Sequence, residues 1–408
     1  MNPHRKNLLA IYAAGIDAVK GDNAVYHALM DRGDLPACHV IAIGKAAEAM
    51  YQGAKRYLET SVKSAFLISK YEHFSAEARI DPQITTLEAA HPVPAESSLQ
   101  AGAQLLDHLH TLPPGEPCLF LISGGASSLC EVLADGWKLD DLQQLTRQLL
   151  AQGYDINSMN AIRQRISRIK GGQLWQHIGK RPVWTLLISD VEGDHPTSIG
   201  SGLLFPPSQD QLPERLPEEW RQRLPSFIRI EVPDDFQWQI VASNPLALLA
   251  MQQAAMERGY RVRIDPRFLN GDAAAEARQC VADLRQSEPG MILWGGETTV
   301  RLPEHPGRGG RNQHFALSAA LAMQQEPELL LLAAGTDGSD GLSADAGALV
   351  DYRSCLRGLA QGRDARDSLK QADSGRFLEA SGDLIHTGPT GTNVMDVVIG
   401  LKRAPENP

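Results

Sequence analysis

Apolar positions along the 408-residue chain form short continuous runs, and stretches with helical spacing separate them. Four runs in the first half are rich in Val, Ile, Leu and Phe and lack strict alternation, which is typical of parallel strands covered on both faces. They span residues 39–43, 65–69, 118–123 and 183–189. Helical patterns at 46–58 and 97–112 lie between them. This order predicts an α/β protein built on an open sheet.

A proline-rich connection, residues 204–236, interrupts this order and predicts at most short helices. The same alternation then resumes. Strands are expected at 239–243, 261–264, 290–294, 329–333 and 394–401, and helices at 245–258, 273–286 and 315–324. The length also suits more than one domain. We therefore expect two domains, residues 1–235 and residues 236–408.

Composition narrows the class of protein. Apolar residues make up 43% and charged residues 22%, as in globular proteins. The 39 Lys and Arg against 49 Asp and Glu give a net charge of −10, which argues against sequence-independent binding of nucleic acid or a membrane surface but leaves room for a local basic pocket. Five widely spaced cysteines predict neither a disulfide framework nor a zinc site, and a reducing compartment fits them best.

The N-terminal apolar run, Leu8 to Ile16, follows Arg5 and Lys6 as in a signal peptide. No small-residue cleavage site follows it, so we expect an amphipathic first helix. The sequence contains no run of about 18 apolar residues, so we expect no membrane-spanning helix. These features favour a cytoplasmic protein.

Glycines and polar residues follow five of the predicted strands. Open α/β sheets bind ligands beyond the carboxyl ends of their strands. The segments concerned are Gly44 with Lys45, and residues 123–128, 189–194, 295–298 and 335–341. Together they predict a site for a phosphate-bearing ligand and a divalent cation.

Two of these segments suit an anion. In residues 123–128, Gly124 and Gly125 would let backbone N–H groups approach phosphate, and a following helix would add positive potential. An ordinary serine-capped turn is the alternative. Lys45 could counter phosphate charge during transfer, or it could be a solvated lysine. The segment is not a P-loop, because His39 and Ala46 stand where that motif needs Gly and Ser or Thr.

Four acids are candidate cation ligands: Asp190, Asp194, Glu297 and Asp337. Mg²⁺ takes carboxylate oxygens, usually one or two together with phosphate oxygens and water. Any single one of these acids could instead be a cap or turn residue. Their repeated position after strands favours the cation site.

Residues 157–172 predict a helix with Asn160, Arg163, Ser167 and Lys170 on one face, because their spacings are 3, 4 and 3. Such a face suits a carboxylate or a phosphate, and a solvated charged face is the alternative.

Two further loops carry polar groups. Glycines around Arg311 would let its planar guanidinium contact a carboxylate or phosphate in bidentate fashion, unless residues 307–313 form a flexible surface loop. Hydroxyls in residues 386–393 could hydrogen-bond a ligand, whereas residues 91–94 indicate a turn that ends a strand.

Several motifs are absent from the sequence. There is no G-x-G-x-x-G with an acid about 20 residues on, no H-E-x-x-H and no G-x-S-x-G. Nicotinamide binding, zinc hydrolysis and α/β-hydrolase chemistry therefore have no local support.

Nine segments, taken in order, resemble the glycerate 2-kinases that carry a C-terminal MOFRL domain. The resemblance covers essentially the whole chain. The segments are residues 43–50, 89–98, 121–129, 160–174, 188–194, 295–300, 307–313, 333–341 and 386–396.

The resemblance implies a kinase that makes 2-phosphoglycerate from D-glycerate with ATP and Mg²⁺. It also implies a larger Rossmann-like, three-layer N-terminal domain, a smaller α/β C-terminal MOFRL domain and an active site in the cleft between them. The family's key cations match Lys45 and Arg311, and its acidic loop matches Asp190 and Asp194. Asp190 could also accept the hydroxyl proton. Substrate or phosphate contacts are expected from Gly44, Ser123, Gly124, Gly125, Ser127, Asn160, Arg163, Lys170, Asn312 and Thr390.

The sequence departs from the family pattern at Ala126, where a third glycine is usual, at His314, where Glu is usual, and at residues 343–346. A kinase of a related 2-hydroxy acid, a hydroxypyruvate reductase (a label some family members carry) and a non-catalytic metabolite-binding protein remain alternatives. The sequence leaves the oligomeric state, a homodimer included, open.

Overall fold

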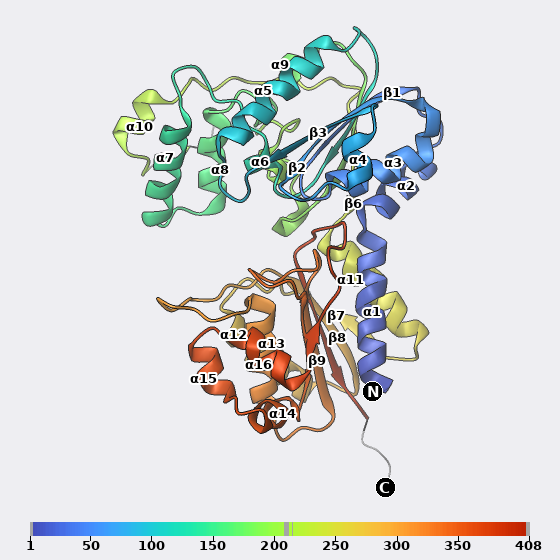
Figure 1. The fold of residues 1–408 in the computed structure, drawn as a ribbon, viewed down its shortest axis with the longest axis vertical. Coiled ribbons are helices and arrows are strands. Elements are labelled where there is room, and N and C mark those ends of the chain that lie inside the picture. The colour runs from blue at the N-terminus through green and yellow to red at the C-terminus, as the bar shows by residue number, and fades with distance from the viewer. Residues whose placement is uncertain (1–2, 208–211, 214, 405–408) are drawn as a thin grey trace. The chain divides into compact units, whose positions relative to one another are not determined.

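The computed structural model describes residues 3–207, 212, 213 and 215–404. The chain divides into two compact units: a central unit, Gly21–Val241, and a terminal unit, formed by the chain up to Lys20 and from Ala242 onward. Each unit is a sheet with helices packed on it (Figure 1). The boundary expected after residue 235 lies close to the division between Val241 and Ala242. The first helix, expected in the N-terminal domain, belongs to the terminal unit.

The central unit has six strands in the order β3-β2-β1-β4-β5-β6. The strands are β1 (Cys38–Ile43), β2 (Val62–Lys70), β3 (Ile84–Ala89), β4 (Cys118–Ile122), β5 (Val183–Ile188) and β6 (Gln237–Ala242). The pairs β1–β2, β2–β3, β1–β4 and β4–β5 are parallel, which confirms the orientation expected for β1, β2, β4 and β5. Strand β3 was not among the four strands predicted for this half of the chain.

The helices of the central unit include several of one or two turns. They are α2 (Gly21–Arg32), α3 (Ala47–Leu58), α4 (Ala76–Ile80), α5 (Glu96–Thr111), α6 (Ala126–Leu129), α7 (Leu139–Ala151), α8 (Ile156–Arg165), α9 (Trp175–Ile178) and α10 (Glu218–Arg223), with 3₁₀ turns η1 (Glu59–Ser61), η2 (Glu192–Asp194) and η3 (Ile199–Ser201).

Every residue of β1 is buried, which explains its unbroken apolar run. Ile41 and Ile43 point to one face of the sheet and pack with Leu105 and Leu109 of α5. The alternate residues of the same strand face the opposite side, where α3 also contacts the sheet.

The terminal unit has a mixed sheet in the order β11-β10-β9-β12-β8-β7. Its strands are β7 (Val262–Ile264), β8 (Gly290–Gly296), β9 (Leu329–Gly335), β10 (Gly347–Asp351), β11 (Leu384–Ile385) and β12 (Asp396–Lys402). Strand β12 is antiparallel to both of its neighbours, β8 and β9.

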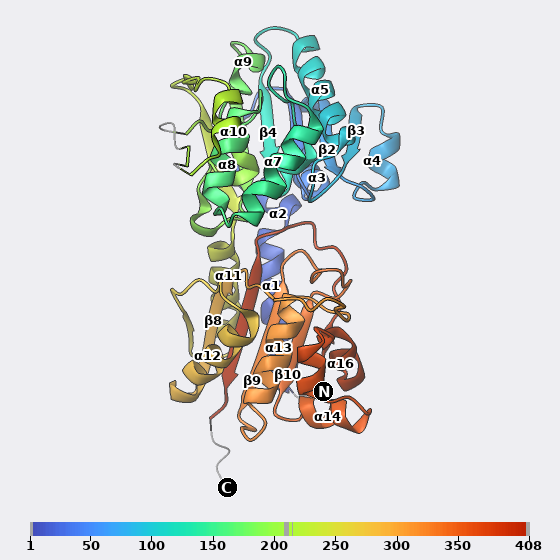
Figure 2. The ribbon, with the colours of Figure 1, turned by 90° about the vertical axis from the view of Figure 1, so that its left-hand side faces the viewer.

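Helices cover both faces of this second sheet. They are α1 (Pro3–Val19), α11 (Asn244–Glu257), α12 (Ala273–Gln286), α13 (Arg311–Ala322), α14 (Ser354–Ala360), α15 (Ala365–Lys370) and α16 (Ser374–Ser381). Leu293 and Leu332 pack toward α1 and α11, whereas Trp294 and Leu331 pack toward α12 and α13. Figure 2 shows α13 lying over β9 and β10.

Helix α1 belongs to the terminal unit because its apolar side completes that core. Leu8, Ile11 and Tyr12 are buried with residues of α11, and Figure 1 shows the two helices side by side. Gly15 permits their close approach, since a Cβ there would lie 2.3 Å from Met251 Cε. The Tyr12 hydroxyl also donates a hydrogen bond of 2.6 Å to Gly335 O, at the end of β9.

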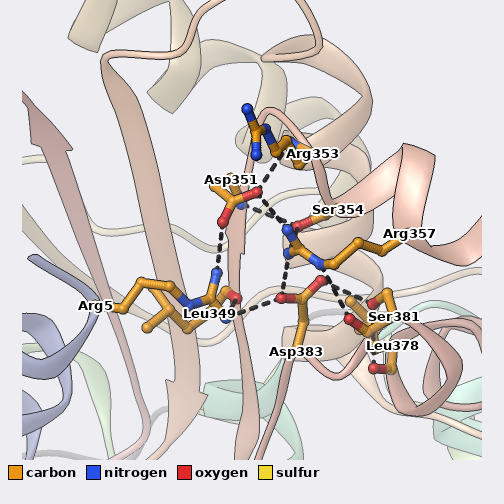
Figure 3. A network of polar contacts seen from close by, with 9 residues as sticks. All are labelled: Arg5, Leu349, Asp351, Arg353, Ser354, Arg357, Leu378, Ser381 and Asp383. Atoms are coloured by element: carbon orange, nitrogen blue, oxygen red, sulfur yellow. Dashed lines mark hydrogen bonds and ion pairs between the residues drawn. The ribbon is translucent and has the colours of Figure 1, made fainter. Parts of the chain in front are cut away.

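Two arginines and two aspartates fasten the beginning of α1 to the same unit (Figure 3). Arg5 binds Asp351 and Asp383 at 2.8 Å each. Arg357 binds the same two carboxylates at 2.9 and 2.6 Å. The four side chains alternate in charge, so each carboxylate is shared by two guanidinium groups.

None of the helices in the described part of the chain combines the length and apolar character that a membrane crossing requires. All five cysteines are buried free thiols. Burial raises the pKa of Cys118 and of Cys130 to about 12, so both thiols stay protonated at neutral pH.

Candidate active site

The sheet of the central unit changes direction between β1 and β4. The chain builds outward from β1 through β2 and β3, and then continues on the other side of β1 with β4, β5 and β6. In open α/β sheets, the loops at the carboxyl ends of the two strands that flank such a point bind the ligand. Here those loops carry Gly44 with Lys45, and Ser123 with Gly124 and Gly125.

Hydrogen bonds tie the two loops together. The Ser123 N–H donates to Ile43 O and the Lys45 N–H donates to Gly124 O, at 2.9 Å each. The Ser123 hydroxyl oxygen accepts from Ala46 N–H at 3.1 Å. Gly44 has no room for a side chain, because a Cβ would lie 2.2 Å from Ser123 Oγ. The Ser123 hydroxyl therefore shapes the turn.

Asp190 lies against the same turn. A Cβ at Gly124 would come within 2.0 Å of Asp190 Oδ2, so the carboxylate that follows β5 touches Gly124. Gly125 has a φ of 87°, which glycine adopts without strain. A Cβ at Gly125 would lie 3.3 Å from Lys45 Cγ. We call this group the switch-point cluster: Gly44, Lys45, Ser123, Gly124, Gly125 and Asp190.

The Lys45 side chain is half-buried, and its ammonium forms no hydrogen bond or ion pair with any residue that the structure describes. The ammonium is not among the buried polar atoms that lack a partner, so it remains open to a ligand. An unpaired ammonium beside a glycine turn at this edge of the sheet suits an anionic ligand.

The helix expected after the turn is only the four-residue α6, so it adds little dipole potential. Ser127 lies in α6, and its Oγ is 2.8 Å from Ser201 Oγ. The Ser201 hydroxyl in turn donates to Asn160 Oδ1 at 3.4 Å. The structure thus brings Ser127 and Asn160 together through Ser201.

The helix predicted over residues 157–172 is wrong in its second half. Helix α8 ends at Arg165, and the chain beyond it is irregular. The Ser167 hydroxyl donates to Glu131 Oε1 at 2.6 Å, and the Lys170 ammonium pairs with Glu131 Oε2. These contacts hold Ser167 and Lys170 in the interior, so they do not share one helix face with Asn160 and Arg163.

Arg163 differs from Lys170 because it lacks such a partner. Its side chain is half-buried, and its guanidinium makes no hydrogen bond or ion pair within the described residues. Burial lowers the pKa of Arg163, and the nearby charge of Glu131 opposes this effect. Arg163 therefore remains a candidate for binding an anion.

Asp194 is the second acid after β5. It lies at the end of η2 with a φ of 54°. Its Oδ1 is buried and accepts no hydrogen bond from the described part of the chain. Such an oxygen lacks a donor or a cation to complete it.

In the terminal unit, Arg311 lies near the ends of three adjacent strands. Asp396, the first residue of β12, stands opposite Gly296 and Gly335, the last residues of β8 and β9. Arg311 Nε and Nη2 donate to the Asp396 carboxylate at 2.5 and 3.1 Å, and Nη1 pairs with Glu297 at 2.8 Å. Burial alone would lower the pKa of Arg311, but these two acids outweigh it and raise that pKa.

Asp340 fixes the beginning of α13, next to Arg311. Its carboxylate accepts from the Asn312 and Gln313 N–H groups at 3.0 and 2.8 Å. Burial raises the pKa of Asp340 to about 7, although these hydrogen bonds oppose the shift. The structure therefore places Asn312 in a helix start that is organised from within the unit.

Thr390 and Asp337 join two loops of the terminal unit. The Thr390 hydroxyl donates to Thr336 O at 2.6 Å, and the Thr390 N–H donates to Asp337 O at 3.4 Å. Asp337 Oδ1 accepts from Ser339 N–H at 2.9 Å. Both residues thus have local partners.

The described residues contain no group of three or more His, Cys, Asp or Glu side chains placed to hold a metal ion. Mg²⁺ needs only one or two carboxylates when phosphate oxygens and water complete its shell. Asp190 and the incompletely bonded Asp194 of the central unit fit that requirement. Glu297 and Asp337, the other two predicted ligands, lie in the terminal unit with partners of their own.

Comparison with known proteins shows to which family the chain belongs. A family model described as a domain of unknown function (DUF4147) matches residues 7–215, and the MOFRL family model matches residues 290–396. The D-glycerate 2-kinase of Thermotoga maritima is 33% identical over 413 residues, which cover 97% of this chain and 98% of that protein. The chain belongs to the glycerate 2-kinase family.

The likeness to the glycerate 2-kinase family extends to three dimensions. A crystal structure of glycerate kinase from Thermotoga maritima matches with a TM-score of 0.86 at 30% identity, over 98% of this chain and 100% of that one. The expected family and the expected α/β fold class are thereby confirmed. Another relative carries a different name: a putative hydroxypyruvate reductase of Agrobacterium vitis is 34% identical over 391 residues, 88% of this chain and 98% of that protein.

The side chains that hold several candidate residues of this glycerate 2-kinase family member in place could not be predicted from its sequence. Asp396 closes the segment 386–396 that carried the resemblance, so its position there was the available signal. Asp340 lies in the glycine-rich segment 335–341, but its carboxylate accepts hydrogen bonds from the first turn of α13. Glu131 had no signal in the sequence.

Proposed function

We propose that the protein is a glycerate 2-kinase that transfers the γ-phosphoryl group of ATP to the 2-hydroxyl of D-glycerate, giving 2-phosphoglycerate and ADP. The observation that carries the proposal is the unpaired Lys45 ammonium beside the glycine turn of the switch-point cluster. The nearly full-length likeness to a D-glycerate 2-kinase supports the same reaction.

The reaction needs charge neutralisation and one proton acceptor. The 2-hydroxyl oxygen bonds to the γ-phosphorus, while the bond from phosphorus to the β–γ bridging oxygen breaks and ADP leaves with that electron pair. We assign Lys45 to the oxygens of the transferring group, where a positioned cation stabilises developing charge. Asp190, which touches Gly124 of the turn, would accept the hydroxyl proton.

Asp194 is the proposed ligand of Mg²⁺, because its buried Oδ1 has no hydrogen bond within the described residues. A bound Mg²⁺ would neutralise part of the triphosphate charge. Substitutions can distinguish the proposed roles of Asp190 and Asp194. Asp194→Asn should raise the Mg²⁺ concentration needed for half-maximal activity, whereas Asp190→Asn should lower kcat without that shift.

Three further side chains belong to the proposal. Arg311 of the terminal unit is the second cation, and its contact with an anionic substrate oxygen would compete with Glu297 for the guanidinium. Arg163 and Asn160 of the central unit would bind carboxylate or phosphate oxygens, since Arg163 has no partner within the described residues. Lys170 is left out, because Glu131 occupies it.

The test is a paired assay on the purified full-length protein. ADP release that depends on D-glycerate, with 2-phosphoglycerate identified by ³¹P NMR, is the expected result. Lys45→Met should lower that rate on the order of 10²-fold or more, while Lys180→Met, at an exposed position, should not. Arms with L-glycerate, other 2-hydroxy acids and other nucleoside triphosphates define the specificity. ADP release without D-glycerate dependence would refute the assignment.

A hydroxypyruvate reductase is the competing function, because a relative carries that name. The central sheet has the strand order of dinucleotide-binding folds. However, the turn after β1 has only Gly44, and β2 ends in Lys70 rather than in an acid for a ribose hydroxyl. NADH oxidation with hydroxypyruvate, measured on the same preparation, is expected to be absent.

A further inference from the structure

His91 lies beside the switch-point cluster, although residues 91–94 were expected only to form a turn and His91 was not among the predicted site residues. It follows β3, whose carboxyl end belongs to the same edge of the sheet as those of β1 and β4. A Cβ at Gly125 would lie 3.1 and 3.2 Å from Cδ2 and Nε2 of His91, and 3.3 Å from Lys45 Cγ. The imidazole and the lysine side chain therefore both border Gly125.

Neither ring nitrogen of His91 forms a hydrogen bond with any residue in the described ranges, although the side chain is half-buried. Lys45, its neighbour across Gly125, has an unpaired ammonium. Both side chains thus have polar atoms that a ligand can reach without first displacing a protein partner.

The environment of His91 keeps its ring uncharged at neutral pH. Burial, followed by the charges of Lys45, Lys70 and His73, lowers the pKa of His91 to about 4. The imidazole is therefore neutral at pH 7, with one N–H donor and one acceptor nitrogen. Because Lys45 is its neighbour across Gly125, an anionic oxygen is the ligand atom that its N–H group and the Lys45 ammonium can bind together.

We propose that His91 is a substrate-binding residue of the switch-point cluster, which donates a ring N–H to an anionic oxygen that Lys45 neutralises. The oxygen belongs to a carboxylate or to a phosphate. Identifying its source as the hydroxy acid or the nucleotide rests on the proposed kinase function. The contact itself does not depend on that function.

The experiment is ¹H–¹³C NMR of the full-length protein with ¹³C-labelled histidine at pH 7. Inorganic phosphate, D-glycerate and ADP are added separately, and the His91 signal is assigned by its loss in His91→Asn. We expect at least one probe to shift this signal saturably, and the responding probe identifies the source of the oxygen. The exposed His27 should not respond.

Affinity provides the second measurement. His91→Ala should weaken binding of the responding probe about tenfold, which is typical of a lost hydrogen bond to a charged group. His27→Ala is the matched control and should bind as wild type does. If His91→Ala does not fold, the titration of the wild-type protein decides alone.

Each outcome has a definite meaning. A His91 signal that none of the three probes moves, in a protein that does phosphorylate D-glycerate, overturns the role of His91 and leaves the proposed function standing. A saturable shift with phosphate in a protein without kinase activity supports the contact and overturns the proposed function instead.

Discussion

Lys170 and Glu131 form an ion pair in the interior of the central unit, where their side chains are 1% and 0% exposed. Removing one partner leaves a buried charge without compensation, which costs about 3–5 kcal/mol. We therefore expect Lys170→Met and Glu131→Gln each to lower the free energy of unfolding by several kcal/mol, as measured by urea denaturation. The double variant Lys170→Met/Glu131→Gln should recover much of the loss, and simple additivity of the two single effects would contradict the pairing.

A substitution at Gly125 should affect both stability, through the backbone conformation, and activity, through the neighbouring side chains. Alanine at this position must adopt a φ near 87°, which costs about 1–2 kcal/mol, and its Cβ would meet Lys45 and His91. We expect Gly125→Ala to lose that stability and also to lower kcat/KM for D-glycerate by about tenfold or more. Gly136→Ala is the control, because its φ is 80° and a Cβ there has nothing within 4 Å. It should lose stability only, and a similar loss of activity in both variants would refute the argument.

Arg311 depends on the planar shape of its guanidinium. It binds Asp396 through two nitrogens and Glu297 through a third, and a lysine cannot reproduce this arrangement. We expect Arg311→Lys to lower kcat/KM on the order of 10²-fold in the D-glycerate assay. Arg376→Lys, at an exposed arginine, should leave the rate unchanged. Full activity of Arg311→Lys would show that charge alone suffices.

The pKa of His91 makes stability depend on pH. It lies at about 4 in the folded protein, below its ordinary value of 6.5, because of burial and the charges of Lys45, Lys70 and His73; Asp190 is the acid against the same turn. Between these two values the unfolded chain binds the additional proton, so stability falls as the pH decreases from about 6.5 to about 4.

His91→Gln lacks this proton equilibrium. Urea denaturation at pH 7.5, 5.5 and 4.5 should therefore show the wild type losing stability relative to the variant as the pH falls. A stability difference that stays constant over this range would contradict the low pKa.

The spacing of apolar residues and the positions of glycine and proline predicted many of the strands and helices, because these signals lie within each segment itself. Residues 273–286 were expected as a helix, and α12 has the same bounds. The helix expected over 157–172 ran too far, since the isoleucines at 162, 166 and 169 keep a helical spacing while Glu131, distant in sequence, binds the chain beyond α8. The antiparallel direction of β12 likewise depends on the path of the chain between β11 and β12. The residues of the strand itself do not reveal that direction.

The candidate site shows the same limit. Gly44, Lys45 and residues 123–125 could be predicted together, because they follow strands and the carboxyl ends of parallel strands meet at one edge. Their surroundings could not, since Asp396 and Glu131 reach Arg311 and Lys170 only through the tertiary fold. The contact of His91 with Gly125 is of the same kind.

Helix α1 has a consequence for how the protein is made. The ribosome completes the central unit while α1 still lacks α11, its packing partner, which lies more than two hundred residues downstream. The apolar side of α1, with Leu8, Ile11 and Ile16, therefore stays uncovered in the nascent chain until the terminal unit emerges. Helix α1 is therefore synthesised before the central unit but can dock only after the central unit has been completed.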